Sequence, residues 1–549
     1  MFSFALIISS ELLMPRIVGD CLIGKENSSQ NKIIISLIFV VLCIIAGDLL
    51  LNFCISKLSS SIFKDLSTDL FKKINTFSIS EVENLGVSTI VSRSTYSINQ
   101  IINFVVTFYK VALCTPIILL VCCLIMWRIH PTLTYGLFCI IVCFIIILIF
   151  IIKKNFSLSL RIHQKLEKLN YKIRSDVTGV KIIRSLNKEK IEEKKFEQIN
   201  SNFTNLVIKL FRSISSIEPF FYILLNISLI ATIFLSSDLI YSKKVNIKEL
   251  YIVTSYNVLV LSYILSFLLL FMMFPKTLTA VSKIQFLFNI QPSIKNNLDK
   301  MEKLEKITTL EFQNVYFRHH SNEEFILKNI NFTAKESEKI AFVGKTGSGK
   351  TTLMNLIPRL IDPSKGVVKI NNIDIKNYDL KLLRNKIGFV SQKNILFKGT
   401  ILSNLLFGKE NASQENILDK SKMSQSYEMI QNKMYQLEEP VSELGSNLSG
   451  GQKQRLSITR AFLKEPDIYI FDDSFSALDY ATDLAIRRSL FEQNTKSITI
   501  IVAQRLSSIL TVDKIIVLDK GEIVNIGTHQ ELMEKCSIYK DIAFSQNIK

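Results

Sequence analysis

Four long stretches without a charged side chain constrain the fold of this chain more than any other feature. Residues 111–127, 132–152, 219–237 and 250–275 contain no Asp, Glu, Lys or Arg. A helix that crosses a membrane needs about 20 consecutive, mostly apolar residues. The sequence therefore predicts at least four transmembrane helices, all within the first 290 residues.

Two further apolar stretches precede these four. Residues 33–55 are interrupted only by Asp48, and residues 2–14 are apolar apart from Glu11. The first of these predicts a fifth transmembrane helix, whereas the second is too short to span a bilayer alone. Asp48 has two interpretations: it lines a path for a substrate or for protons, or it lies near the cytoplasmic interface.

The positive charge of the chain is distributed as in a membrane protein. The formal net charge of +18 is compatible with nucleic-acid binding. However, residues 153–212 alone contain 15 Lys and Arg against 6 Asp and Glu, a net charge of +9. Such an excess beside apolar segments marks a cytoplasmic loop. We therefore expect no nucleic-acid partner, and we expect residues 56–97 and the C-terminal half on the cytoplasmic side as well.

The cysteines indicate neither a metal site nor a disulfide framework. Seven of the nine lie in or beside apolar segments, and none is spaced from a histidine as metal ligands are. We interpret them as small packing residues.

A phosphate-binding motif opens the second half of the chain. The apolar stretch KIAFVG at 339–344 predicts a strand, and GKTGSGKT at 344–351 follows it and fits G-x-x-x-x-G-K-[ST]. Glycines let backbone N–H groups surround a β-phosphate, a lysine reaches the β- and γ-phosphates, and a hydroxyl joins the Mg²⁺ shell. The predicted nucleotide-binding residues are Gly344, Lys345, Thr346, Gly347, Ser348, Gly349, Lys350, Thr351 and Thr352.

Two more elements of phosphate chemistry follow the P-loop. The apolar strand at 467–472 ends in Asp472, which we interpret as the carboxylate that supports the metal. The motif LSGGQ precedes a predicted helix, whose N-terminus attracts anions. Its residues are Leu448, Ser449, Gly450, Gly451 and Gln452.

Together with SALD at 476–479, these motifs resemble the nucleotide-binding domain of an ABC transporter. The stretch FVSQKNILFKGTILSNLLFG at 389–408 resembles the Q-loop of that family, which implies that Gln392 contacts Mg²⁺ and the membrane domain. The resemblance implies an all-α, six-helix transmembrane domain at 1–290, a linker at 291–308 and an α/β P-loop ATPase domain at 309–549. It also implies ATP and Mg²⁺ as cofactors.

The membrane half resembles the six-helix exporter type of this family. Residues 83–101 and 175–200 are similar to its two cytoplasmic loops, whose short coupling helices transmit nucleotide-driven motion. Residues 11–20 are similar to the outer half of its first helix. The family has a longer segment before that helix, so we expect a truncated first helix. The resemblance places the protein in the plasma membrane as a multi-pass protein in contact with lipid.

Two residues depart from the family pattern at the catalytic position. Asp473 stands where the family has the Glu that orients the attacking water, and Gln504 stands where it has a His. Asp is shorter by one methylene, roughly 1.5 Å, and a catalytic group displaced by about 1 Å can lose about a hundredfold in rate. An amide can donate a hydrogen bond to a γ-phosphate, but unlike an imidazole it cannot take up a proton or carry a positive charge.

A smaller departure concerns adenine. His319 stands where the family has an aromatic ring that stacks on the base. An imidazole can stack with less area than Tyr. The alternative is an ordinary surface histidine.

These departures predict one subunit of a heterodimeric exporter of hydrophobic, drug-like or lipid-like molecules. A slow, degenerate ATP site would be formed by Lys350, Asp472, Asp473 and Gln504. The intact LSGGQ motif, which is the signature motif of the family, would complete an active site on a homologous partner. Two alternatives remain: a homodimer that uses Asp473 as a slow base, and a regulatory subunit that binds ATP without transporting.

Overall fold

A computed structural model describes residues 2–21, 27–296, 302–319, 323–493 and 496–548, which fall into two compact units. The first unit comprises Met1–Thr76 and Leu85–Gln291, and the second comprises Phe77–Asn84 and Pro292–Lys549. Residues 297–301 of the expected linker lie outside the described part of the chain.

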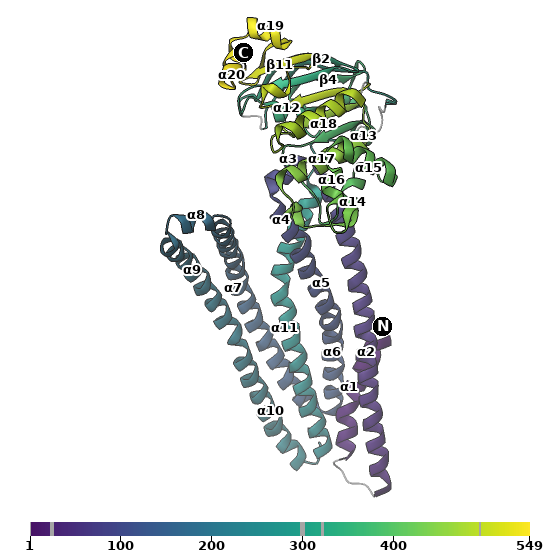
Figure 1. Ribbon diagram of the computed structural model, residues 1–549. Helices are drawn as coiled ribbons and strands as arrows, with labels where there is room; N and C mark the ends of the chain where they lie inside the picture. Colours follow the sequence, from purple (N-terminus) through teal and green to yellow (C-terminus); the bar gives the residue numbers. More distant parts are fainter. Residues whose placement is uncertain (1, 22–26, 297–301, 320–322, 494–495, 549) are drawn as a thin grey trace. The chain divides into compact units, whose positions relative to one another are not determined.

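The described residues of the first unit are helical throughout, as the long apolar stretches predict (Figure 1). With no water to satisfy backbone N–H and C=O groups in a bilayer, a helix that pairs them internally is the stable solution. The elements are α1 (Phe2–Cys21), α2 (Asn27–Ile74), α4 (Val87–Ser92), η1 (Arg93–Ser97), α5 (Ile98–Thr107), η2 (Phe108–Ala112), α6 (Cys114–Ile129), α7 (Pro131–Thr178), α8 (Val180–Ser185), α9 (Glu189–Ser215), α10 (Ile217–Tyr241) and α11 (Ile247–Asn289).

Four helical stretches of the described residues are long and apolar enough to cross a membrane. They are Asn31–Ile74, Val87–Ile129, Glu189–Tyr241 and Ile247–Phe267. Helix α7 contains the apolar stretch 132–152, but many of its side chains there lie outside the described set. Helix α1 has 20 residues, which corresponds to about 30 Å. The chain is thus a multi-pass membrane protein.

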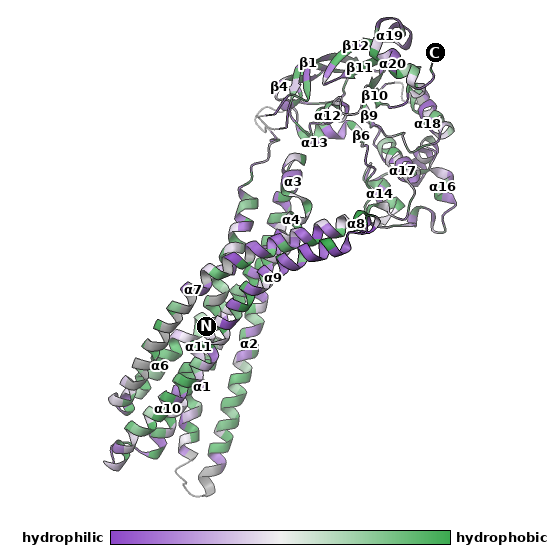
Figure 2. Ribbon diagram, turned by 90° about the vertical axis from the view of Figure 1, so that its left-hand side faces the viewer, coloured by the Kyte–Doolittle hydropathy of each residue, from purple (hydrophilic) through white to green (hydrophobic). Residues whose placement is uncertain are grey.

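Several helices continue far beyond their apolar stretches. Helices α2 and α7 have 48 residues each, whereas a membrane crossing needs about 20. Figure 2 shows hydrophilic residues gathering along the end of the α7–α9 pair that carries α8. Short helices occur in both loops that resemble coupling segments: α4 lies in the first and α8 in the second.

Two acidic residues lie within the apolar stretches 2–14 and 33–55 of this unit. Glu11 of α1 accepts a hydrogen bond from the hydroxyl of Tyr263 in α11, with an O···O distance of 2.6 Å. Asp48 of α2 has an exposed side chain in this unit. Neither interpretation of Asp48 is tested by this geometry, so its role stays a prediction.

The second unit is built around a six-stranded sheet with the order β12-β11-β3-β10-β9-β6. All its strand pairs are parallel except β11–β12. Strands β9 and β10 are buried along their whole length, as expected for parallel strands covered on both faces. The bounds are β3 (Lys339–Val343), β6 (Ile387–Val390), β9 (Ile468–Asp472), β10 (Ile498–Val502), β11 (Lys514–Asp519) and β12 (Glu522–Gly527).

An antiparallel sheet with the order β2-β1-β4-β5 adds a second layer to this unit. It shares a core with the larger sheet through stacked Phe312 and Phe332 and through Phe342 of β3. The remaining strands are β1 (Thr309–Phe317), β2 (Leu327–Lys335), β4 (Lys365–Ile370), β5 (Ile373–Asp374), β7 (Gly399–Thr400) and β8 (Pro440–Val441).

Helices surround the two sheets (Figure 1). Those of the second unit are α3 (Ile79–Leu85, of which Leu85 belongs to the first unit), η4 (Ile375–Asn377), η5 (Gln436–Glu438), η6 (Glu443–Gly445), η7 (Leu506–Ser508), α12 (Lys350–Leu356), α13 (Leu380–Asn385), α14 (Ile401–Leu406), α15 (Gln414–Met423), α16 (Tyr427–Gln431), α17 (Gly450–Leu463), α18 (Tyr480–Gln493), α19 (His529–Lys535) and α20 (Ser537–Ser545). The segment 77–84 joins this unit through Glu81, whose carboxylate accepts from the backbone N–H of Ser293 at 3.1 Å. Hydrogen bonds from Ser78 and Ser293 lower the pKa of Glu81 although burial opposes them.

Candidate functional site

The candidate site lies where four neighbouring parallel strands end. The register pairs Val502 of β10 with Asp472 of β9 and with Phe342 of β3, and it pairs Val390 of β6 with Phe471. In open parallel sheets, ligands bind at the carboxyl ends of the strands. The loops after these four strands carry the P-loop, Gln392, Asp473 and Gln504, so the topology explains why these distant residues meet.

These loops enclose a cavity of about 480 Å³, within the range of small-molecule sites. Most of the residues that the sequence predicts as a nucleotide site line it. They are Gly344, Lys345, Thr346, Gly347, Gly349, Lys350, Thr351, Thr352, Gln392, Asp472, Asp473 and Gln504.

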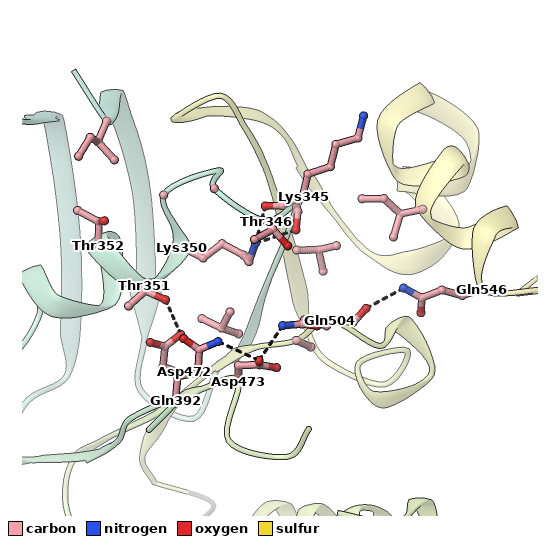
Figure 3. Close-up of a pocket in the computed structure, with 18 residues that line it drawn as sticks. Lys345, Thr346, Lys350, Thr351, Thr352, Gln392, Asp472, Asp473, Gln504 and Gln546 are labelled. Atoms are coloured by element: carbon pink, nitrogen blue, oxygen red, sulfur yellow. Dashed lines mark hydrogen bonds between the residues drawn. The ribbon is translucent and has the colours of Figure 1, made fainter. Parts of the chain in front are cut away.

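Lys350 lies at the centre of the P-loop (Figure 3). Its ammonium group donates to the carbonyl oxygens of Gly344 at 2.7 Å and Lys345 at 2.9 Å, and to Ser348 Oγ at 3.3 Å. Burial lowers the pKa of this ammonium, and the carboxylates of Asp472 and Asp473 act against that shift. The loop thus holds a partly desolvated cation in its own concave side, where an anion of several charges fits.

Two glycines allow this loop to approach its neighbours. A Cβ at Gly344 would lie 2.1 Å from the carbonyl oxygen of Leu518, so no other residue fits there. Gly349 has φ 97° at the N-cap of α12, a conformation that L-residues rarely adopt. The cradle therefore fits a polyphosphate, with backbone N–H groups and Lys350 as its donors.

Asp472 and Thr351 form the second part of the site. Thr351 Oγ1 donates to Asp472 Oδ1 at 3.2 Å. Burial raises the pKa of Asp472, and the charge of Asp473 raises it further, while Thr351 and Lys350 lower it. A hydroxyl, a carboxylate and the nearby side-chain amide of Gln392 are oxygen donors of the kind that Mg²⁺ prefers, together with phosphate oxygens. These residues therefore fit a magnesium ion.

Asp473 leaves the strand in a left-handed conformation, with φ 50°. Alternation along a strand predicts that Asp472 and Asp473 point to opposite faces. Instead both line the cavity, because the chain turns after Asp472 and the backbone N–H of Asp473 donates to the Val502 carbonyl at 3.2 Å. Their partners differ, since Asp472 contacts Thr351 whereas Asp473 contacts Gln392 and Gln504.

The carboxylate of Asp473 accepts two amide hydrogen bonds (Figure 3). Gln504 Nε2 donates to Asp473 Oδ2 at 2.7 Å, and Gln392 Nε2 donates to the same oxygen at 3.4 Å. Burial raises the pKa of Asp473, while Gln392, Lys350 and Gln504 lower it. The two residues that depart from the family pattern are therefore in direct contact.

Gln546 is a site residue that the sequence analysis missed. Its Nε2 donates to the Gln504 carbonyl at 2.7 Å, and its Oε1 accepts from the Leu506 N–H at 2.7 Å. Gln546 follows α20 and lines the cavity, as Ile542 does. No motif surrounds it, so only the folded chain reveals this contact.

His319 and the LSGGQ residues do not join this cavity in the described residues. The His319 ring packs edge-on against Phe317 at 5.2 Å between centroids and is exposed. Ser449 is the N-cap of α17. Its hydroxyl accepts a hydrogen bond from the backbone N–H of Gln452 at 3.3 Å, and Gln452 Oε1 accepts one from the backbone N–H of Ser449 at 3.0 Å. Within LSGGQ, Ser449 and Gly450 are exposed outside the P-loop cavity, whereas Leu448 is buried.

Comparisons with known families agree with this geometry. The model for the ABC transporter transmembrane region matches residues 2–265, and the ABC transporter model matches residues 327–476. Together the two matches take in most of the chain and both halves of the structure. The protein is thus a membrane transporter whose transmembrane and ATP-binding domains are fused in one chain, and it belongs to the ABC transporters.

Individual relatives are similar to this chain, and a solved structure shares its fold. The uncharacterized ABC transporter ATP-binding protein YfiB of Bacillus subtilis is 28% identical over 537 residues, which cover 97% of this chain and 93% of that protein. A putative multidrug export ATP-binding/permease protein of Staphylococcus aureus is 41% identical over 255 residues, which cover 46% of this chain and 44% of that protein. A structure of a bacterial Atm1-family ABC exporter with ATP bound shares the fold, with a TM-score of 0.87, 20% identity and coverage of 100% of this chain and 97% of that one.

Proposed function

We propose that this chain is one half of an ATP-driven exporter in the plasma membrane, with its ATPase domain on the cytoplasmic side. A membrane domain at 1–290, a linker at 291–308 and an ATPase domain at 309–549 agree with the composition of the chain. The substrates are hydrophobic or amphiphilic, drug-like or lipid-like molecules. The description of the S. aureus relative as a putative multidrug export protein supports export of such compounds, and lipid rather than nucleic acid surrounds the first domain.

The cavity of the second unit binds ATP with Mg²⁺ in this proposal. When bound, MgATP supplies the γ-phosphoryl group whose hydrolysis releases free energy for transport. Lys350 holds the phosphates, and Thr351, Asp472 and Gln392 provide oxygen ligands for the metal. Thr346, Gly347 and Thr352 complete the cradle, and His319 stacks on adenine once it turns from Phe317.

The hydrogen bond between Gln504 and Asp473 is the main observation behind our proposal that this site hydrolyses ATP slowly. Gln504 Nε2 lies 2.7 Å from Asp473 Oδ2, so one of the two oxygens of the carboxylate that would accept a proton from water already accepts an amide hydrogen bond. An amide cannot take up that proton in turn, and the shorter Asp side chain holds the carboxylate back from the position that a Glu reaches.

A different, homologous partner completes the transporter in this proposal. The intact signature of this chain, Leu448–Gln452, contacts ATP on the partner, which carries the Glu and the His. The exposure of Ser449 and Gly450 supports such a contact. The pair would then contain one fast site and one slow site, and hydrolysis at the fast site would reset the cycle.

One observation favours a homodimer as the second candidate. Burial raises the pKa of Asp473, which makes the carboxylate a stronger base than an exposed aspartate. Two copies of this chain could then hydrolyse ATP slowly at both sites. A regulatory subunit that only binds ATP is the third possibility and requires no hydrolysis at either site.

Two substitutions in the protein purified with its copurifying partner distinguish these candidates. Ser449→Arg blocks the signature, and Asp473→Asn removes the base of this chain. In an unequal pair, Ser449→Arg abolishes most of the ATPase activity and Asp473→Asn leaves most of it. Ser446→Arg, at an exposed position three residues earlier, is the control and is expected to keep full activity.

Equal loss of activity in Ser449→Arg and Asp473→Asn would contradict the unequal pair and support the homodimer. An ATPase rate that neither substitution changes would contradict both and support the regulatory subunit. Because Ser449 caps α17, its replacement costs about 1 kcal/mol of helix stability, so thermal unfolding of each variant is measured alongside.

A further inference from the structure

A basic pocket lies between two helices of the membrane domain, and its residues are well separated in sequence from those of the nucleotide site. It has a volume of about 530 Å³ and lies between α7 and α9, which run side by side (Figures 1 and 2). Its lining consists of Ser157, Leu158, Arg161, Lys209, Arg212, Ser213 and Ser216. Three cations and three hydroxyl groups thus converge with one apolar side chain, and none of the family motifs includes them.

The three cations of this pocket have no acidic counterpart. No carboxylate lines the pocket, and no ion pair joins Arg161, Lys209 or Arg212 to any residue in the described part of the chain. Three like charges that face one pocket repel one another unless an anion lies between them. The pocket is therefore electrostatically incomplete as the protein alone forms it.

The same two helices neutralise their charge elsewhere. Lys172 of α7 pairs with Asp176 at 2.7 Å and also with Glu192 of α9, which in turn accepts from Lys195 at 2.8 Å. These bonds raise the pKa of Lys172 and lower that of Glu192. These helices thus carry carboxylates opposite some of their cations, whereas the three cations of the pocket converge on a lining that contains no carboxylate.

The pocket begins at the depth of lipid headgroups. Ser157 and Arg161 follow the end of the apolar stretch 132–152 by five and nine residues, about 8 and 14 Å along a helix. Ser216 directly precedes α10, and Lys209 lies about 12 Å before it. The polar layer of a bilayer is about 5–8 Å thick on each side. Ser157 and Ser216 therefore lie at its depth, whereas the backbones of Arg161 and Lys209 lie just beyond it on the aqueous side, with their long side chains lining the same pocket.

We propose that this pocket binds the phosphate of an anionic phospholipid headgroup in the cytoplasmic leaflet. Arg161 and Arg212 are suited to bidentate contacts with phosphate oxygens, and Lys209 adds a point charge. Ser157 and Ser213 offer hydroxyl donors, whereas Ser216 already donates to the Arg212 carbonyl at 2.7 Å. The position at the membrane surface favours a lipid phosphate over a free anion. This inference does not depend on how fast the ATP site works.

Native mass spectrometry of the full-length protein in detergent tests this proposal, with phosphatidylglycerol and phosphatidylcholine as probes. We expect phosphatidylglycerol to bind at least tenfold more tightly than phosphatidylcholine, because each cation near a membrane surface contributes about 1 kcal/mol toward an anionic lipid. The triple variant Arg161→Gln/Lys209→Gln/Arg212→Gln should lose that preference. The matched control Lys168→Gln/Lys190→Gln/Lys194→Gln removes the same charge from the same helices outside the pocket and should keep it.

Three results would overturn the proposal. They are an unchanged preference in the pocket variant, an equal loss in the control, and displacement of phosphatidylglycerol by excess inorganic phosphate, which would identify a free-anion site. If the triple variant does not fold, Lys209→Gln alone serves. It should weaken phosphatidylglycerol binding about fivefold and leave phosphatidylcholine unaffected, and no change in either would count against the site.

Discussion

The two sides of the nucleotide cavity differ in how completely they match an ABC ATPase. On the P-loop side, Lys350, Thr351 and Asp472 have the expected residue types and contact one another or the loop. On the opposite side, Asp473 and Gln504 stand where the sequence analysis expects a Glu and a His, and they bond to each other. Under the proposal of a slow site, nucleotide binding and water activation are separable in this fold.

The largest expected effect tests the P-loop side. Lys350→Ala removes the charge that holds the phosphates, and hydrogen bonds to charged groups contribute about 1.5–3 kcal/mol, so nucleotide affinity should fall roughly tenfold to a hundredfold. Photolabelling of this chain by 8-azido-ATP measures the affinity. Lys345→Ala is the control, because the Lys345 side chain points away from the phosphate cradle (Figure 3). A similar loss in both variants would mean that overall charge, not the cradle, holds the nucleotide.

Gln546 allows a smaller test on the opposite side. Gln546→Ala removes the bonds to the Gln504 carbonyl and the Leu506 N–H, each worth about 1 kcal/mol. The Leu506 amide should then exchange its hydrogen roughly fivefold to thirtyfold faster. Gln546→Glu keeps the acceptor for Leu506 and should show a smaller change. Asp541 is an exposed residue of α20, the helix that Gln546 follows, and Asp541→Ala should show no change in the exchange rate.

An exchange rate at Leu506 that does not change in Gln546→Ala would contradict the role of Gln546 in holding the Gln504 loop. Faster exchange in Asp541→Ala as well would point to general loosening of α20 instead.

The smallest effect concerns pH. Burial raises the pKa of Asp473 above its ordinary value of 3.8, so the folded state binds a proton more readily than the unfolded state and the ionised carboxylate costs stability. That cost is fully present above the folded pKa and disappears below the unfolded value. Asp473→Asn should therefore unfold at a slightly higher temperature than the original protein near neutral pH, and the difference should shrink as pH falls. A difference that does not vary with pH would contradict this explanation.

The P-loop itself could be predicted from the sequence because its residues are contiguous. Lys350 contacts Gly344, only six residues away, and a single strand–loop–helix motif places both. The meeting of Asp472, Gln392 and Gln504 depends on the order of the parallel strands β6, β9 and β10, which the sequence analysis did not predict. In the membrane half, the apolar stretches indicated where helices lie but not where they end, since α2 and α7 continue through polar residues.

Features that depend on a single dihedral angle or on distant contacts could not be predicted. The φ of 50° at Asp473 turns its side chain into the cavity, against the alternation of an ideal strand. Gln546 lies 42 residues from Gln504, with no motif that links them. A hydrogen bond between distant loops, such as that between Gln546 and Gln504, leaves no periodic signal in a sequence.

Restoring the family residues tests the central claim most directly. The double variant Asp473→Glu/Gln504→His gives the site a longer carboxylate and a side chain that can carry a proton. We expect the ATPase rate at this site to rise on the order of tenfold to a hundredfold, with Lys350→Ala in the same background abolishing the gain. An ATPase rate of the reconstituted pair that stays unchanged in the double variant would contradict the account of two unequal sides.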